Sequence, residues 1–195
     1  MKHNHGLTFI ELLISLSLLA VVLVAGINLF LIPNKAFDKI IIQSSLEDDV
    51  NEVLREIGID IRSATKPAPE TNAIIVYNSD GDTDTSGNRI DIYDYKDNKY
   101  YKVSYKYSDG FLYKGSIEKD TSDSIKTASI DNYSEILSGI IYPSEGELFQ
   151  DITIEPEEHN RRTISINLIA EDETGNFFTS HERPLIFTSR TKSSP

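Results

Sequence analysis

The sequence predicts an α+β protein in which one long N-terminal helix packs on an antiparallel β-sheet. Three observations predict this fold class: an apolar run near the N-terminus, a following stretch with helical periodicity, and a remainder made of short alternating segments. A helix that precedes a series of strands is typical of α+β domains with segregated elements. The 195 residues leave room for one domain with a modest core.

The first element is an apolar run of 21 residues, 12–32, interrupted only by two serines and one asparagine. At about 1.5 Å per residue, a helix of this length spans the roughly 30 Å hydrocarbon core of a bilayer. The segment 1–6 before it carries Lys2 and no acidic residue, which favours a cytoplasmic N-terminus. We therefore predict a transmembrane helix at 7–33, with residues 1–6 in the cytoplasm and the rest of the chain outside the membrane.

A cleaved secretory signal is the alternative interpretation of this run, with Leu23-Val24-Ala25 as the small-residue site. Secretory signals have shorter apolar regions, of roughly 7–15 residues, so the length favours an anchor. Neither interpretation explains Glu11, at the cytoplasmic edge of the run. A carboxylate inside a membrane segment costs on the order of 2.5–3.5 kcal/mol and is usually paired and functional, although a carboxylate at the headgroup boundary is tolerated.

The residues around Glu11 carry a family resemblance. Gly6-Leu7-Thr8-Phe9-Ile10-Glu11, between a basic leader and a long apolar run, resembles the N-terminus of type IV prepilins, usually written G-F-T-L-I-E. The resemblance implies cleavage by prepilin peptidase between Gly6 and Leu7, N-methylation of the Leu7 amine, and pairing of Glu11 with the amine of a neighbouring subunit. Two opposite charges in a low-dielectric bundle relieve each other's desolvation cost, so such a pair can set axial register.

The resemblance also implies partners and a location. The expected partners are other pilin or pseudopilin subunits, the prepilin peptidase/N-methyltransferase and the pilus assembly platform in the membrane. The precursor is expected in the inner (cytoplasmic) membrane as a single-pass protein, and at the cell surface in a pilus after assembly. The implied fold is type IV pilin-like, a long N-terminal helix covered in part by an antiparallel sheet.

The stretch 34–66 predicts an amphipathic helix that continues the first one. Apolar residues recur at spacings of 3 or 4 and share one face of a 3.6-residue helix, whereas the other faces are charged. Pro33 is expected to kink or restart the helix, and the prolines at 67 and 69 to end it near Ala64. The face predicted to lie against a sheet consists of Val50, Val53, Leu54, Ile57, Ile61 and Ala64.

Residues 70–195 predict an extracellular β-sheet domain. Short alternating or apolar runs separated by turn residues are typical of half-buried strands. Asp109-Gly110 predicts a tight hairpin turn, residues 173–176 predict a second turn, and the polar stretch 116–132 predicts a loop. Strands are predicted at 73–77, 90–95, 101–107, 111–113, 136–142, 149–154, 163–170, 177–178 and 185–187.

The order of these segments resembles that of PilW-like minor pilins and J-type pseudopilins, and a major pilin is the alternative subclass. The shared landmarks are short: the helix end at 60–64, then 74–77, an Asp/Gly loop, 90–93, 110–113 and 137–140. Three functions remain open at this point. They are a minor pilin that assembles into or primes a type IV pilus, a pseudopilin of a type II secretion or DNA-uptake system, and a membrane-anchored extracellular binding or adhesin module.

The loop 80–91 offers oxygen ligands at offsets that imitate a calcium-binding loop. Hard oxygen donors clustered on a turn suit Ca²⁺, but Thr85 replaces the glycine that such a loop needs at its sharp turn. The alternative interpretation is a solvated Asp/Gly turn between strands. Weak Ca²⁺ binding is the hypothesis, and its ligands are Asp80, Asp82, Asp84, Asn88 and Asp91.

Composition excludes other chemistries. Asp plus Glu total 31 against 19 Lys plus Arg, a formal net charge of −12, which argues against direct nucleic-acid binding. The absence of cysteine excludes disulfides and thiol nucleophiles. We expect no enzymatic activity, because no hydrolase or phosphate-loop motif occurs and His159 and His181 each stand alone in a polar stretch.

Overall fold

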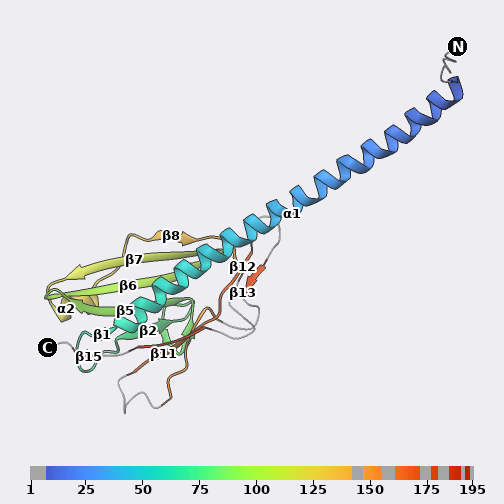
Figure 1. Ribbon diagram of the computed structural model, residues 1–195. Helices are drawn as coiled ribbons and strands as arrows, with labels where there is room; N and C mark the ends of the chain where they lie inside the picture. Colours follow the sequence, from blue (N-terminus) through green and yellow to red (C-terminus); the bar gives the residue numbers. More distant parts are fainter. Residues whose placement is uncertain are drawn as a thin grey trace. The chain divides into compact units, whose positions relative to one another are not determined.

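The computed structural model describes residues 8–141, 147–154, 161–171, 177–179, 185–189 and 192–193. The chain divides into two compact units, an N-terminal unit (Met1–Ser44) and a C-terminal unit (Ser45–Pro195). Helix α1 (Phe9–Ser63) supplies the described helix of the first unit and the first helix of the second (Figure 1). The architecture is α+β, as the sequence predicts.

The N-terminal unit contains the predicted membrane span. Phe9–Ile27 has a mean hydropathy of 2.6, is long and apolar enough to cross a membrane, and buries none of its residues. The helix assignment runs through Pro33 without interruption, so the expected restart does not occur. A proline removes one backbone hydrogen bond, which weakens a helix locally without obliging it to end.

The C-terminal unit packs the last part of α1 against the sheets. The predicted apolar face is confirmed, because each of its members is at most 6% exposed. Ile57 and Ile61 are fully buried in one core with Ile90, Ile92 and Tyr105 of the sheet. The 3.6-residue period therefore identified the packing surface of this helix correctly.

The largest sheet has six antiparallel strands in the order β3-β2-β5-β6-β7-β8, of which β5 to β8 can be followed in Figure 1. Asp109 and Gly110 adopt positive φ values of 53° and 86° in the turn between β6 and β7, which confirms the predicted hairpin. The strands are β2 (Ile74–Tyr77), β3 (Thr83–Asp84), β5 (Arg89–Lys96), β6 (Lys99–Ser108), β7 (Phe111–Lys119) and β8 (Ser134–Leu137).

Smaller sheets complete the fold. The first has the order β14-β11-β10-β4, formed by Leu185–Thr188, Thr163–Ile166, Phe149–Asp151 and Ser86–Gly87. The second has the order β13-β12-β9, formed by Phe177–Thr179, Ile169–Glu171 and Ile140–Ile141. A parallel pair joins β1 (Thr65–Lys66) to β15 (Lys192–Ser193). The turn predicted at 173–176 lies outside the described residues, but the flanking strands pair antiparallel with Glu171 opposite Phe177.

Four sequence predictions need correction. The stretch 116–132 is not a loop throughout, because β7 extends to Lys119 and a short helix, α2 (Ser122–Thr127), follows. The predicted strands 136–142 and 163–170 each divide into two strands that join different sheets, and 149–154 shortens to β10.

The first of these divisions, within 136–142, falls at Gly139, whose φ is +72° and where a Cβ atom would lie 2.2 Å from the carbonyl oxygen of Glu171. Only glycine tolerates both conditions, and the chain turns there.

The six-stranded sheet is buried on both faces. Along β5, Ile90 and Ile92 belong to the core with α1, whereas the alternate residues Asp91 and Tyr93 are 2% and 3% exposed. Helix α2 contacts β6 and β7, and its Ile125 is fully buried. The segment predicted as a loop therefore forms part of a second layer.

Polar contacts fasten α1 to the sheet. The buried Tyr105 hydroxyl donates to Asp60 Oδ2 at 2.6 Å. The Lys114 ammonium lies 2.8 Å from Glu56 Oε1 and 3.2 Å from Asp60 Oδ2. Burial raises the pKa of Tyr105, and its bond to Asp60 adds to the rise. Burial lowers the pKa of Lys114, but Glu56 and Asp60 outweigh it, so that this pKa is raised.

These pKa shifts predict that the C-terminal unit loses stability in alkali. Tyr105 and Lys114 hold their protons in the folded state at pH values where the unfolded side chains, with ordinary pKa values of 10.0 and 10.5, release them. Their contribution is complete below pH 10.0 and is lost as the pH rises through the folded pKa values. Urea unfolding of the full chain in detergent is expected to show a lower midpoint at about pH 11 than at pH 8. Tyr105→Phe is expected to reduce this difference, and equal midpoints for the wild type would contradict the assignment.

Candidate functional site

Thr8 and Glu11 form the start of α1. The Thr8 backbone N–H and hydroxyl each donate to Glu11 Oε2 at 2.8 Å, and the Glu11 N–H donates to Thr8 Oγ1 at 3.3 Å. This reciprocal arrangement is a capping box, which satisfies backbone donors that a helix N-terminus leaves free. The sequence analysis missed this local role of Glu11, although the T-x-x-E spacing before an apolar run is its usual signal.

The predicted processing residues lie next to this cap. Gly6 and Leu7, between which cleavage is predicted, lie outside the described residues. Glu11 is exposed, and none of the ion pairs formed within the described ranges involves it. Its pairing with a subunit amine stays a prediction.

Comparison with known families addresses this segment directly. Residues 1–27 match the family model for the prokaryotic N-terminal methylation motif. The matched range includes the predicted cleavage position, the capping box and most of the apolar run. The match supports a type IV prepilin-like precursor, of the pilin or pseudopilin type, that is processed by prepilin peptidase and assembles with other subunits.

The motif indicates a structural subunit, and it agrees with a membrane-anchored chain. It covers the first 27 of 195 residues. The comparison with curated proteins finds no match, and neither does the comparison with solved structures. The finer assignment to PilW-like or J-type proteins stays a prediction.

The first part of the predicted calcium loop is a turn with its own hydrogen bonds. The Asn78 side-chain oxygen accepts from the backbone N–H groups of Asp80 and Asp82, both at 3.0 Å. Gly81 has a φ of +90°, and the Asn78 N–H donates to the Asp82 carbonyl at 2.9 Å. Asn78 therefore organises this turn, as asparagine commonly does.

The later residues of the loop belong to the strands that follow. Asp84 Oδ1 accepts from the Thr85 N–H at 2.6 Å, and the Asn88 N–H donates to the Tyr77 carbonyl at 3.0 Å. Gly87, in β4, lies against the same Tyr77 carbonyl, because a Cβ atom there would sit 1.8 Å from its oxygen. The close approach of two backbones at this point requires glycine.

Asp91 lies apart from the turn, in a buried polar cluster on the sheet. It is 2% exposed, accepts from the Ser104 hydroxyl at 2.6 Å, and lies 3.3 Å from Arg89 Nε and 3.4 Å from Lys102 Nζ. The cluster continues outward, because Lys102 Nζ also donates to the Ala128 carbonyl at 2.8 Å. Arg89 and Lys102 already neutralise the Asp91 carboxylate. Asp91 therefore has a structural role in the sheet.

The structure does not gather the predicted calcium ligands at one point. Asp80 and Asp82 lie on the turn, whereas Asp91 lies in the buried cluster. Within the ranges that the structure describes, no group of three or more His, Cys, Asp or Glu side chains is placed to hold a metal ion. Calcium binding at this loop stays a prediction.

A polar hollow of 610 Å³ adjoins the loop. Its lining carries both signs of charge: Asp80 and Asp109 are acidic, and Arg89 and Lys106 are basic. Mixed charges of this kind favour neither an anion nor a cation. The hollow therefore does not indicate which class of ligand an extracellular binding module would bind.

Proposed function

We propose that the protein is a minor pilin, a structural subunit that prepilin peptidase cleaves and that assembles into or primes a type IV pilus. The N-terminal methylation motif at residues 1–27 carries this proposal. The features that follow the motif fit a filament subunit, because an apolar helix precedes a folded domain with its own core.

The exposed apolar helix supports the assembly step. Phe9–Ile27 keeps its apolar side chains on the surface, with Phe9 79% and Val21 68% exposed. In the membrane, lipid covers this surface. In a filament, the helices of other subunits cover it, so that lipid contacts are exchanged for protein contacts at little cost in free energy.

Glu11 supplies the docking charge in this mechanism. Cleavage after Gly6 would expose the Leu7 amine, which is methylated and carries a positive charge. Glu11 of one subunit then pairs with that amine on its neighbour. The attraction is strong because lipid and helices exclude water, and it relieves the cost of holding an unpaired carboxylate in the membrane.

The orientation follows from the flanking charges. The basic leader stays in the cytoplasm, and the acidic C-terminal unit lies outside the inner membrane. A pseudopilin of a secretion or DNA-uptake system is the second candidate, because the same motif and helix serve both classes. A subunit found in sheared surface filaments favours the pilus, whereas one confined to the membrane fraction favours the pseudopilin.

Mass spectrometry of the N-terminal peptide tests the proposal. We expect protein isolated from its native membrane or from sheared filaments to begin at methylated Leu7. Cells without prepilin peptidase provide the control and are expected to keep residues 1–6. If the leader is also retained in cells with an active peptidase, the protein is an ordinary anchored domain and the assembly mechanism is wrong.

A further inference from the structure

Strand β8 forms an edge of the six-stranded sheet. It pairs with β7 on one side, and within the described residues no strand pairs with its other side. An edge strand presents backbone N–H and C=O groups that another chain can pair with. Ser134 and Glu135 at its start are exposed, so solvent reaches this edge.

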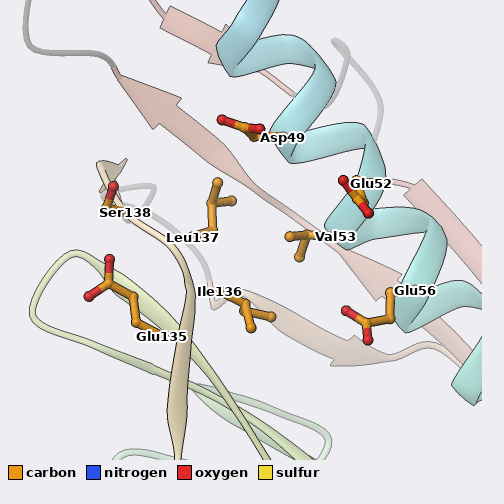
Figure 2. Close-up of a pocket in the computed structure, with 8 residues that line it drawn as sticks. All are labelled: Asp49, Glu52, Val53, Glu56, Glu135, Ile136, Leu137 and Ser138. Atoms are coloured by element: carbon orange, nitrogen blue, oxygen red, sulfur yellow. The ribbon is translucent and has the colours of Figure 1, made fainter.

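A groove runs between this strand and α1 in the C-terminal unit (Figure 2). Its volume is 390 Å³, and its apolar floor includes Val53 and Leu137, each 6% exposed. Figure 2 shows Val53 directed from the helix towards Ile136 and Leu137 of the strand. We call this feature the acidic groove, lined by Asp49, Glu52, Val53, Glu56, Glu135, Ile136, Leu137 and Ser138.

The lining is charged with one sign only. Four of its eight residues are acidic and none is basic. Glu56 pairs with Lys114, whereas none of the ion pairs within the described part of the chain involves Asp49, Glu52 or Glu135. A cationic occupant would therefore gain attraction from three carboxylates that form no ion pair within the described residues.

From this geometry we propose that the acidic groove binds an extended segment rich in lysine or arginine from a different filament subunit, which adds a strand to β8. Every second side chain of an added strand faces α1, so that a segment with apolar and basic residues on this one face meets both Val53 and the carboxylates of the helix. A second copy of this chain is disfavoured as the occupant, because its net charge of −12 repels the groove. Recognition of a basic strand depends on the groove alone, and only the identity of the partner as a filament subunit rests on the proposed function.

Peptide binding tests the recognition step. The full chain in detergent is titrated with a labelled hexapeptide, Lys-Thr-Val-Thr-Lys-Thr, whose lysines and valine share one face when it is extended, and fluorescence anisotropy reports binding. Glu52→Gln/Glu135→Gln is expected to weaken binding roughly tenfold, because it removes two attracting carboxylates and each exposed ion pair is weak by itself. Asp48→Asn, an exposed acid on the same helix outside the groove, is the matched control and should bind like the wild type. Equal affinities for the wild type and the double variant would overturn the proposal.

Strand pairing is tested with a second peptide. The same hexapeptide with methylated backbone nitrogens keeps its charge and loses its backbone donors, and it is expected to bind at least about tenfold more weakly. If both peptides bind equally, the groove attracts cations without adding a strand, and the proposal is wrong in that respect.

Cross-linking in cells tests the partner. The chain has no cysteine, so Ser138→Cys gives a single thiol in the groove. A thiol-to-amine cross-linker is expected to join it to a lysine of a second protein that carries the same N-terminal motif. A cross-link to another copy of this chain, or none, would overturn the identity of the partner. The N-terminal mass of the same samples reports separately on the proposed function.

Discussion

Replacing Glu11 with alanine is expected to abolish incorporation of the protein into filaments while the C-terminal unit stays folded. Removal of one partner from a water-excluded ion pair costs about 3–5 kcal/mol, which corresponds to at least about a hundredfold loss of docking affinity. The C-terminal unit has its own core, so the substitution should leave its thermal unfolding unchanged. Immunoblots of the sheared filament fraction against the membrane fraction measure the effect.

The capping box calls for two control variants, because Glu11→Ala removes the cap together with the charge. Glu11→Gln keeps an acceptor for Thr8 and removes only the charge, so it is expected to fail like alanine. Thr8→Ala weakens the cap, at about 0.5–2 kcal/mol, and keeps the charge, so it is expected to incorporate. If Glu11→Gln assembles as well as the wild type, the residue acts as a helix cap and the docking role is wrong.

Replacing Asp91 with alanine is expected to lower the free energy of unfolding by about 3–5 kcal/mol, because the buried Lys102 ammonium loses its counter-ion. Lys102 is 8% exposed and cannot reach water without disturbing its contact with Ala128. Urea unfolding of the full chain in detergent, followed by tyrosine fluorescence, measures the loss.

Asp82→Ala on the exposed turn is the matched control and is expected to change stability by less than about 0.5 kcal/mol. The double variant Asp91→Leu/Lys102→Met is expected to recover most of the stability, because apolar replacement of a buried pair is often neutral or stabilising. Equal losses for the two alanine variants would refute the buried ion pair. A stability gain of the wild type in calcium that Asp91→Ala lacks would instead favour the metal hypothesis.

The fold could be predicted from the sequence where apolar residues recur with a regular helical period and pack against a single sheet. Ile57 and Ile61 lie on the predicted face of the helix and are fully buried, because the period of a helix fixes which residues face a sheet. The Asp109-Gly110 turn could be predicted equally well from the sequence. Its two successive residues have positive φ values, and an Asp-Gly pair is one of the few that adopt them readily.

The errors arose where distant backbone decides a local conformation. Gly139 interrupts an apolar run because the Glu171 carbonyl approaches it, and nothing near residue 139 in the sequence reports that approach. Asp91 and Lys102 alternate with apolar residues along the predicted strands, and this alternation does not reveal that their face of the sheet is covered. They are buried because α2 and the Ala128 region cover the sheet, and this cover was predicted to be a loop.

The parallel pair of β1 and β15 has a consequence for the timing of export. Thr65, just after α1, pairs with Lys192, far along the sequence. If the C-terminal unit reaches the far side of the membrane as it is synthesised, its first strand cannot find its partner until Lys192 has crossed. A subunit truncated before Lys192 would therefore reach the assembly stage with β1 unpaired.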